Sequence, residues 1–154
     1  MSMNPKAQAK NQTITKNEMT VSWTFESDFI SFEISAPTTG WVAIGFNETN
    51  DLTVTYLVMG SITADQVKIQ EHYVFGPGNY RSYKTLNEPE SVTGISGNHS
   101  GENTTLRFSL PTTSFYQYTK QLKPGKEYTM LMAFSQEKAF QHHSIMRTSI
   151  NVKL

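Results

Sequence analysis

The sequence predicts an all-β fold, a single-domain antiparallel β-sandwich of the immunoglobulin-like kind. Apolar residues recur with period two along most of the chain, turn-forming segments separate these runs, and no segment shows a convincing helical period. The 154 residues suffice for one domain with a single core. We therefore expect a disordered N-terminal lead-in over residues 1–18 and one sandwich domain over residues 19–154.

The first two predicted strands, residues 19–25 and 29–35, are expected to form a hairpin. In each run every second residue is large and apolar, and the turn Glu-Ser-Asp at residues 26–28 separates them. The apolar residues that share a face are Met19, Val21, Trp23 and Phe25 in the first run and Ile30, Phe32 and Ile34 in the second.

The next two runs, residues 40–46 and 54–60, are apolar at both alternating positions, which is typical of central strands covered on both faces. Alternation returns at residues 66–75, 105–110 and 128–134 and in a last strand that ends at Leu154. The turn-forming segments between the runs include APTTG, GPGN, SGNHSGEN and KPGK. These patterns predict about eight or nine strands, and residues 111–122 are the one place where we expect a short helical turn.

Composition excludes several classes of function. Lys and Arg total 13 and Asp and Glu total 13, so nucleic acid, which requires a basic excess, is not an expected partner. No segment is apolar over the length that a membrane span requires. The absence of cysteine excludes disulfides, thiolate metal sites and cysteine nucleophiles, and leaves histidine, methionine and carboxylates as metal ligands.

Common catalytic motifs are also absent from the sequence. There is no Gly-x-Ser-x-Gly elbow, no phosphate-binding loop that ends in Lys-Ser/Thr, and no His-Glu-x-x-His. The glycines of GPGNY flank a proline and precede no predicted helix, which favours a turn over a phosphate site. Carboxylates are scattered, although distant acids could still meet in the fold as a glycosidase pair. We therefore expect a binding protein rather than an enzyme.

The C-terminal segment AFQHHSIMRTSINVKL contains two of the four histidines. If the alternation set by Leu154 and Val152 continues back unbroken, His142 points into the end of the sandwich, while His143 and Arg147 face the other way. A β-bulge would exchange the two histidines. Because neighbours on a strand face opposite ways, the pair is not expected to bind one ion together. A hydrogen-bonded core histidine is the competing interpretation.

Two stretches of the sequence together resemble the DOMON domain family. The segment APTTGWVAIGFNETNDLTVTYLVMG is similar to the hallmark segment of that family, and VKIQEHYV and TTLRFSLP occupy the places of its middle strands. The end of the chain, residues 128–154, is similar to the last two strands of the family, with a His just before the final strand and an Arg several residues after that His. The resemblance implies a DOMON-like β-sandwich from about Met19 onward, located outside the cytoplasm.

DOMON domains hold haem or sugar ligands, and the resemblance implies one of these for this chain. In haem-binding members one Met and one His are the axial ligands, and the His position matches His142, with Arg147 downstream. Leu52 occupies the Met position and cannot coordinate iron, so the chain departs from the family pattern there. The remaining sulfur candidates, each with core filling as the alternative, are Met59, Met130 and Met132.

We therefore predict a non-catalytic, extracytoplasmic ligand-binding module whose signal peptide is not part of this sequence. Haem b is the expected cofactor, with His142 as the iron ligand. A module of this kind could transfer electrons to a redox partner protein. The other residues assigned to this cofactor site are His143, Arg147 and Met59. The alternatives are an adhesion domain without a ligand, or a carbohydrate or other small-ligand site with aromatic faces from Trp41 and Tyr73.

Overall fold

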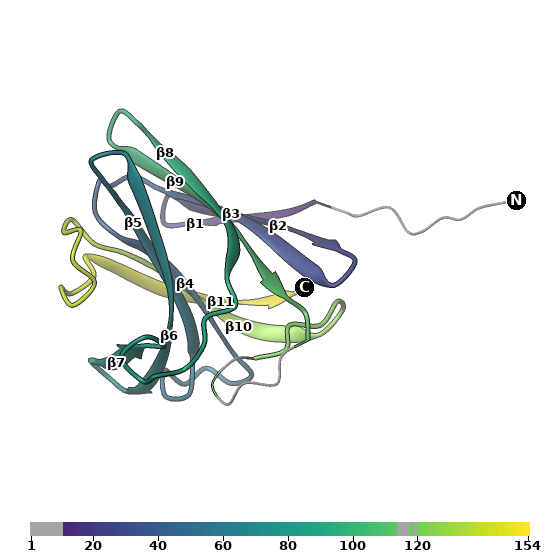
Figure 1. The fold of residues 1–154 in the computed structure, drawn as a ribbon. Coiled ribbons are helices and arrows are strands. Elements are labelled where there is room, and N and C mark those ends of the chain that lie inside the picture. The colour runs from purple at the N-terminus through teal and green to yellow at the C-terminus, as the bar shows by residue number, and fades with distance from the viewer. Residues whose placement is uncertain (1–10, 114–117, 119) are drawn as a thin grey trace, which may run out of the picture.

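Two antiparallel sheets pack face to face in the computed structural model, which describes residues 11–113, 118 and 120–154 (Figure 1). The five-stranded sheet has the order β1-β2-β3-β9-β8, and the six-stranded sheet has the order β11-β10-β4-β5-β6-β7. No helix occurs within the described residues. The predicted antiparallel β-sandwich is therefore confirmed.

The strands have the following bounds. The five-stranded sheet consists of β1 (Gln12–Lys16), β2 (Met19–Glu26), β3 (Phe29–Ala36), β9 (Asn103–Pro111) and β8 (Thr93–Ser100). The six-stranded sheet consists of β11 (Met146–Lys153), β10 (Glu127–Phe134), β4 (Val42–Asn47), β5 (Tyr56–Thr63), β6 (Gln66–Gly76) and β7 (Asn79–Ser82). As predicted, β2 and β3 pair as a hairpin, and nearly every residue of β4 and β5 is buried.

The six-stranded sheet is apolar on both faces. Alternate residues such as Phe46 and Met132 enter the main core between the sheets, where Phe46 contacts Phe32 at a ring-centroid distance of 5.5 Å. The residues at the other alternating positions of these strands, such as Ala43 and Met59, belong to a second, smaller cluster on the outer face of the same sheet. This outer cluster is the part of the fold that positions the candidate site.

The N-terminal boundary was predicted wrongly. Strand β1 lies inside the segment expected to be a disordered lead-in, and it pairs with β2 from Gln12↔Trp23 to Lys16↔Met19. Only Ile14 of this strand packs against the main core, which explains why the apolar pattern did not reveal it. Residues 1–10 lie outside the described residues, so the expectation of disorder is untested there.

Two segments were predicted to form turns, residues 96–103 and residues 111–122. Strand β8 covers most of the stretch SGNHSGEN that was predicted to be a turn, and it is largely exposed at the edge of its sheet. For the helical turn expected in residues 111–122, residues 114–117 and 119 lie outside the described residues, so this prediction stays untested.

The two adjacent histidines lie in a loop and not on a strand. Val152 and Leu154 are buried, as their phase predicted, but β11 begins only at Met146, and both histidines are exposed. The prediction that His142 points into the end of the sandwich is therefore wrong. The physical reason is that Ser135 Oγ donates a hydrogen bond to the carbonyl of His143 at 2.8 Å, which holds the loop outside the strand ladder.

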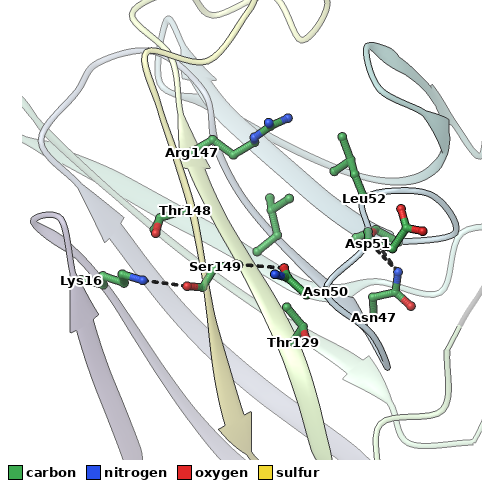
Figure 2. A pocket seen from close by; sticks show the side chains of 11 residues that line it. Lys16, Asn47, Asn50, Asp51, Leu52, Thr129, Arg147, Thr148 and Ser149 are labelled. Atoms are coloured by element: carbon green, nitrogen blue, oxygen red, sulfur yellow. Dashed lines mark hydrogen bonds between the residues drawn. The ribbon is translucent and has the colours of Figure 1, made fainter.

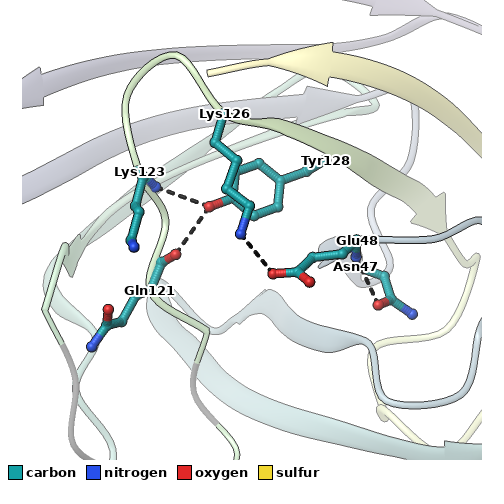
Figure 3. A network of polar contacts seen from close by, with 6 residues as sticks. All are labelled: Asn47, Glu48, Gln121, Lys123, Lys126 and Tyr128. Carbon is teal, nitrogen blue, oxygen red and sulfur yellow. Dashed lines mark hydrogen bonds and ion pairs between the residues drawn. The ribbon is translucent and has the colours of Figure 1, made fainter.

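Polar contacts anchor the loops at the end of β4 and before β10 (Figure 3). The Tyr128 hydroxyl accepts a hydrogen bond from the Lys123 amide and donates one to the Gln121 carbonyl, both at 3.0 Å. Lys126 Nζ lies 2.8 Å from Glu48 Oε2, but both side chains are largely exposed, so this ion pair adds little stability. Asn47 Nδ2 donates to the carbonyls of Asp51 at 2.6 Å and Thr53 at 2.9 Å, and these bonds hold the loop 48–55, which borders the candidate site.

Candidate functional site

A small apolar cavity of about 110 Å³ lies on the outer face of the six-stranded sheet, above the second cluster. It brings together residues from β4, β5, β6, β7, β10 and β11 and from the loops around them. Five residues singled out from the sequence lie in its wall, namely Trp41, Leu52, Met59, His143 and Arg147. These residues are distant in the chain, and only the sheet order makes them neighbours.

Met59 reaches the cavity because its position on β5 faces outward. It pairs with Ala43 on β4, which in turn pairs with Ala133 on β10. The two alanines leave the space beside the Met59 side chain that a larger residue would fill. Met59 itself is 1% exposed, so its thioether belongs to the buried wall of the cavity. Met130 and Met132, by contrast, are fully buried in the main core, as the core-filling alternative requires.

Trp41 fixes the loop that carries the histidines. Its side chain is buried, its Nε1 donates a hydrogen bond to the His142 carbonyl at 3.1 Å, and its backbone amide donates to the Glu137 carbonyl at 2.9 Å. His142 therefore contacts Trp41 through its backbone, whereas His143 is one of the residues that line the cavity. Neither histidine therefore enters the space between the two sheets, and His143 lies at the cavity on the outer face.

Tyr73, the second aromatic candidate, lies elsewhere. It packs against Tyr118 with 4.6 Å between ring centroids and against Phe75 at 5.1 Å, and it borders the main core. Its partner on β5 is Tyr56, which faces the main core, and so Tyr73 does not meet Trp41 across one pocket. Carbohydrate binding at a platform of Trp41 and Tyr73 receives no support from this arrangement and stays an alternative prediction.

His72 is a buried histidine that the sequence analysis did not single out. It is 3% exposed on the outer side of β6, with its ring 5.5 Å from that of Phe140 and 6.0 Å from that of Tyr80. Its Nδ1 lies 3.1 Å from the Gln70 carbonyl, which can only accept, so Nδ1 carries the proton. His72 and His143 both line a groove of about 550 Å³ that adjoins the cavity.

Burial of His72, helped by the nearby charge of Lys68, lowers its pKa from 6.5 to about 4. Because the fold favours the neutral imidazole, this stabilisation is complete above about pH 6.5 and is lost as the pH falls towards 4. We expect protonation of His72 to lower the free energy of unfolding by roughly 3 kcal/mol as the pH falls from about 6.5 to about 4. Urea denaturation at a series of pH values measures this loss.

The His72→Gln variant should show a flatter pH dependence than the wild type. His99→Gln, at an exposed position on the edge strand β8, is the matched control and should follow the wild type. If His72→Gln lost stability in parallel with the wild type, His72 would not be the group that titrates.

A polar pocket of about 420 Å³ adjoins the cavity on its other side, and Figure 2 shows the residues around it. Leu52, Leu131 and Arg147 line both spaces. Arg147 is exposed on the outer side of β11, which is the orientation that the strand phase predicted. No hydrogen bond or ion pair of its side chain occurs within the described residues.

Charged ligands for a bare metal ion are not gathered at the site. Within residues 11–113, 118 and 120–154, no group of three or more His, Asp and Glu side chains could hold a metal ion. The same part of the chain has no helix with the length and apolar character needed to cross a bilayer. The residues that line the cavity are mostly apolar. They include one histidine and one methionine, whose side chains are possible ligands for the iron of a cofactor.

Comparison with known proteins gives one matching family and two solved structures with a similar fold. A family model described as the DOMON domain matches residues 15–135. The search of curated proteins found no match. The cytochrome domain of cellobiose dehydrogenase from Myriococcum thermophilum is similar in structure, with a TM-score of 0.69 and 11% identity over 95% of this chain and 82% of that one. The cytochrome b domain of pyranose dehydrogenase from Coprinopsis cinerea gives 0.63 and 12% over 91% and 80%. At such identities the likeness concerns the fold.

Proposed function

The chain belongs to the DOMON domain family, and from this premise we propose that it is a non-catalytic module that binds haem b in the outer cavity. One observation carries the proposal: His143 and Met59, whose side chains end in an imidazole and a thioether, both line the same apolar cavity. Imidazole and thioether are both established haem ligands, and the chain has no cysteine that could compete.

The donor chemistry of the cavity fits haem, but the cavity is small. Its volume of about 110 Å³ is below the range of roughly 300–1,000 Å³ that is usual for ligand sites. Binding therefore requires the loop with Leu52 to move away from the sheet. That loop already holds Val54 at a φ of 65°, a left-handed conformation that is costly for a β-branched residue.

The residues of the wall have distinct roles in the proposal. His143 supplies the nitrogen ligand. Because Leu52 has no sulfur atom, Met59, the methionine in the lining of the cavity, is the candidate sulfur ligand. Trp41 acts as a positioning residue, since its hydrogen bond to the His142 carbonyl holds the loop from which His143 projects. Arg147 at the rim can donate hydrogen bonds to the carboxylates of a bound haem. Haem, when bound, supplies reversible one-electron chemistry.

Electron transfer to a redox partner protein, outside the cytoplasm, is the role we propose for the module. Its support is the DOMON membership and the likeness in fold to two cytochrome domains of dehydrogenases. The test is titration of haem into the purified protein, followed by the absorption of bound iron. Saturable binding with a reversible reduction supports the proposal, and the absence of saturable binding at micromolar haem would refute it.

Substitution of Leu52 by methionine should complete the ligand pair. Leu52 lines the cavity from the loop, so Leu52→Met places a thioether where the family pattern expects one. We expect haem to bind about tenfold more tightly, with a shift of its absorption towards the six-coordinate, low-spin form. Leu131→Met, on β10 in the wall of the same cavity, is the matched control. Equal spectra for both variants and the wild type would contradict the role given to the Leu52 position.

A further inference from the structure

Tyr56 is a tyrosine in the main core whose hydroxyl contacts a buried carboxylate. The residue is 0% exposed, and its hydroxyl donates a hydrogen bond to Glu71 Oε2 at 2.5 Å. Glu71 is also 0% exposed. The strand register explains the contact, because Tyr56 on β5 pairs with Tyr73 on β6, and Glu71 precedes Tyr73 on the same face of β6. A phenol and a base are thus held together away from water.

This pair suits the loss of an electron from Tyr56. Burial and the neighbouring charge of Glu71 raise the pKa of the Tyr56 hydroxyl well above its ordinary value, so Tyr56 is a neutral phenol at rest. A phenol that loses an electron becomes a strong acid, and Glu71 Oε2 is in place to take its proton. The transfer turns the carboxylate into a neutral acid and so removes a charge from the core, where a charge is costly.

Tyrosine rings lead from Tyr56 towards the surface. The ring centroids of Tyr56 and Tyr83 are 6.2 Å apart, and those of Tyr83 and Tyr118 are 6.3 Å apart. The Tyr118 ring lies 4.6 Å from the Tyr73 ring. All three separations are those of aromatic rings in contact, so an electron can move along them in short steps. Tyr83 is fully buried, whereas Tyr118 and Tyr73 are half-buried and meet the solvent.

Tyr128 is a buried tyrosine without these features. It is 2% exposed, and its hydroxyl donates to the Gln121 carbonyl and accepts from the Lys123 amide (Figure 3). A backbone carbonyl accepts a hydrogen bond but does not take up a proton near neutral pH. The ring beside that of Tyr128 belongs to Phe46, at a centroid distance of 6.3 Å. Among the described residues, Tyr128 therefore has neither a base at its hydroxyl nor a neighbouring tyrosine ring.

We infer that Tyr56 is a redox-active residue that holds one oxidising equivalent as a neutral tyrosyl radical. A one-electron oxidant at the surface, such as a peroxyl radical, takes an electron and a proton from Tyr73 and becomes a hydroperoxide. An electron then moves from Tyr56 to Tyr73 along the rings of Tyr83 and Tyr118, and Tyr73 recovers its proton from water. The hydroxyl proton of Tyr56 moves to Glu71 Oε2 in the same step.

Other residues form the outer cavity, and the protein supplies every group of this step, so the inference does not rest on haem binding. The experiment therefore uses the full chain without haem. Light and persulfate convert a ruthenium tris-bipyridine complex in solution into the one-electron oxidant. Electron paramagnetic resonance of frozen samples should then show a persistent tyrosyl radical in the wild type. Infrared difference spectra should show the carbonyl stretch of a protonated carboxylic acid that appears together with the radical.

Two variants and one matched control assign the radical. Tyr56→Phe should lose the persistent signal, and Tyr128→Phe, which removes the other type of buried hydroxyl, should keep it. Glu71→Gln cannot accept the proton, so it should lose both the persistent radical and the infrared band. A persistent signal in Tyr56→Phe, its loss in Tyr128→Phe, or a radical that appears without the carboxylic acid band would overturn the inference.

Ser91→Ala separates the proton transfer from a general loosening of the core. Ser91 Oγ donates to Glu71 Oε2 at 2.9 Å, so this variant weakens the same network and leaves the phenol and the carboxylate in place. We expect Ser91→Ala to keep the persistent radical and the infrared band. If Ser91→Ala lost the radical as Glu71→Gln does, packing around Tyr56 and not proton transfer to Glu71 would explain the signal, and the inference would fail.

Discussion

Haem titrated into the His143→Ala variant is expected to give no saturable complex, whereas His142→Ala should bind haem like the wild type. The reason is that His143 supplies the only imidazole in the wall of the outer cavity, while His142 contributes its backbone carbonyl to the Trp41 contact. Loss of a residue that merely orients a metal ligand costs about 10- to 100-fold in affinity, so loss of the ligand itself should exceed this. The measurement is the absorption of bound iron during the titration.

His72→Ala is the third arm of this experiment. His72 lines the adjoining groove, and its unprotonated Nε2 has no hydrogen-bond partner within the described residues. Loss of binding in His72→Ala alone would move the haem site from the cavity into the groove. Loss of haem binding in His142→Ala alone would mean that the loop rearranges on binding. The side chain of His142 would then face inward in the bound state, as the strand alternation predicted from the sequence.

The strand pattern predicted most of the sandwich because burial follows side-chain alternation directly. In β9 every second residue is buried, and in β2 the same holds from Met19 to Trp23, as the period of two requires. The pattern failed where a strand buries little. Strand β1 packs one apolar residue against the main core, and β8 is an edge strand with almost every residue exposed. Backbone pairing holds such strands in place, and it leaves no mark in the sequence.

The candidate site was harder to predict than the fold. Met59, Arg147 and Trp41 could be named from the sequence, but their meeting at one cavity depends on the order of strands in the sheet. The choice between His142 and His143 depended on where β11 begins, which the loop contacts of Trp41 and Ser135 decide. Strand boundaries of this kind are set by tertiary hydrogen bonds, and periodicity carries no information about them.

Glu71 is a residue that the sequence pattern could have revealed. It lies on β6 between Ile69 and Tyr73, at the position whose alternation points towards the main core. A carboxylate at an inward position is costly to bury, so it signals a network of hydrogen-bond donors around it. The structure supplies this network: Glu71 is fully buried, and the donors come from Tyr56, Ser91 and Val92.

Substitution of Glu71 by alanine is expected to lower the free energy of unfolding by about 3–5 kcal/mol. Its Oε2 accepts from the Tyr56 hydroxyl at 2.5 Å and from Ser91 Oγ at 2.9 Å, and its Oε1 accepts from the amides of Ser91 and Val92. All of these donors would lose their acceptor inside the protein. The contacts also fix the segment that crosses from β7 in one sheet to β8 in the other, so its attachment weakens at the same time.

Urea denaturation measures the effect of Glu71, with Glu33→Ala as the matched control. Glu33 is an exposed carboxylate paired with Arg107 at 2.8 Å, and its removal should cost less than about 1 kcal/mol. Tyr56→Phe removes one donor and should cost less than Glu71→Ala. Burial raises the pKa of Tyr56, so its hydroxyl keeps its proton, and this stabilisation is present below pH 10 and is lost as the pH rises further. A Glu71→Ala variant as stable as Glu33→Ala would show that the crossing segment does not depend on the buried carboxylate.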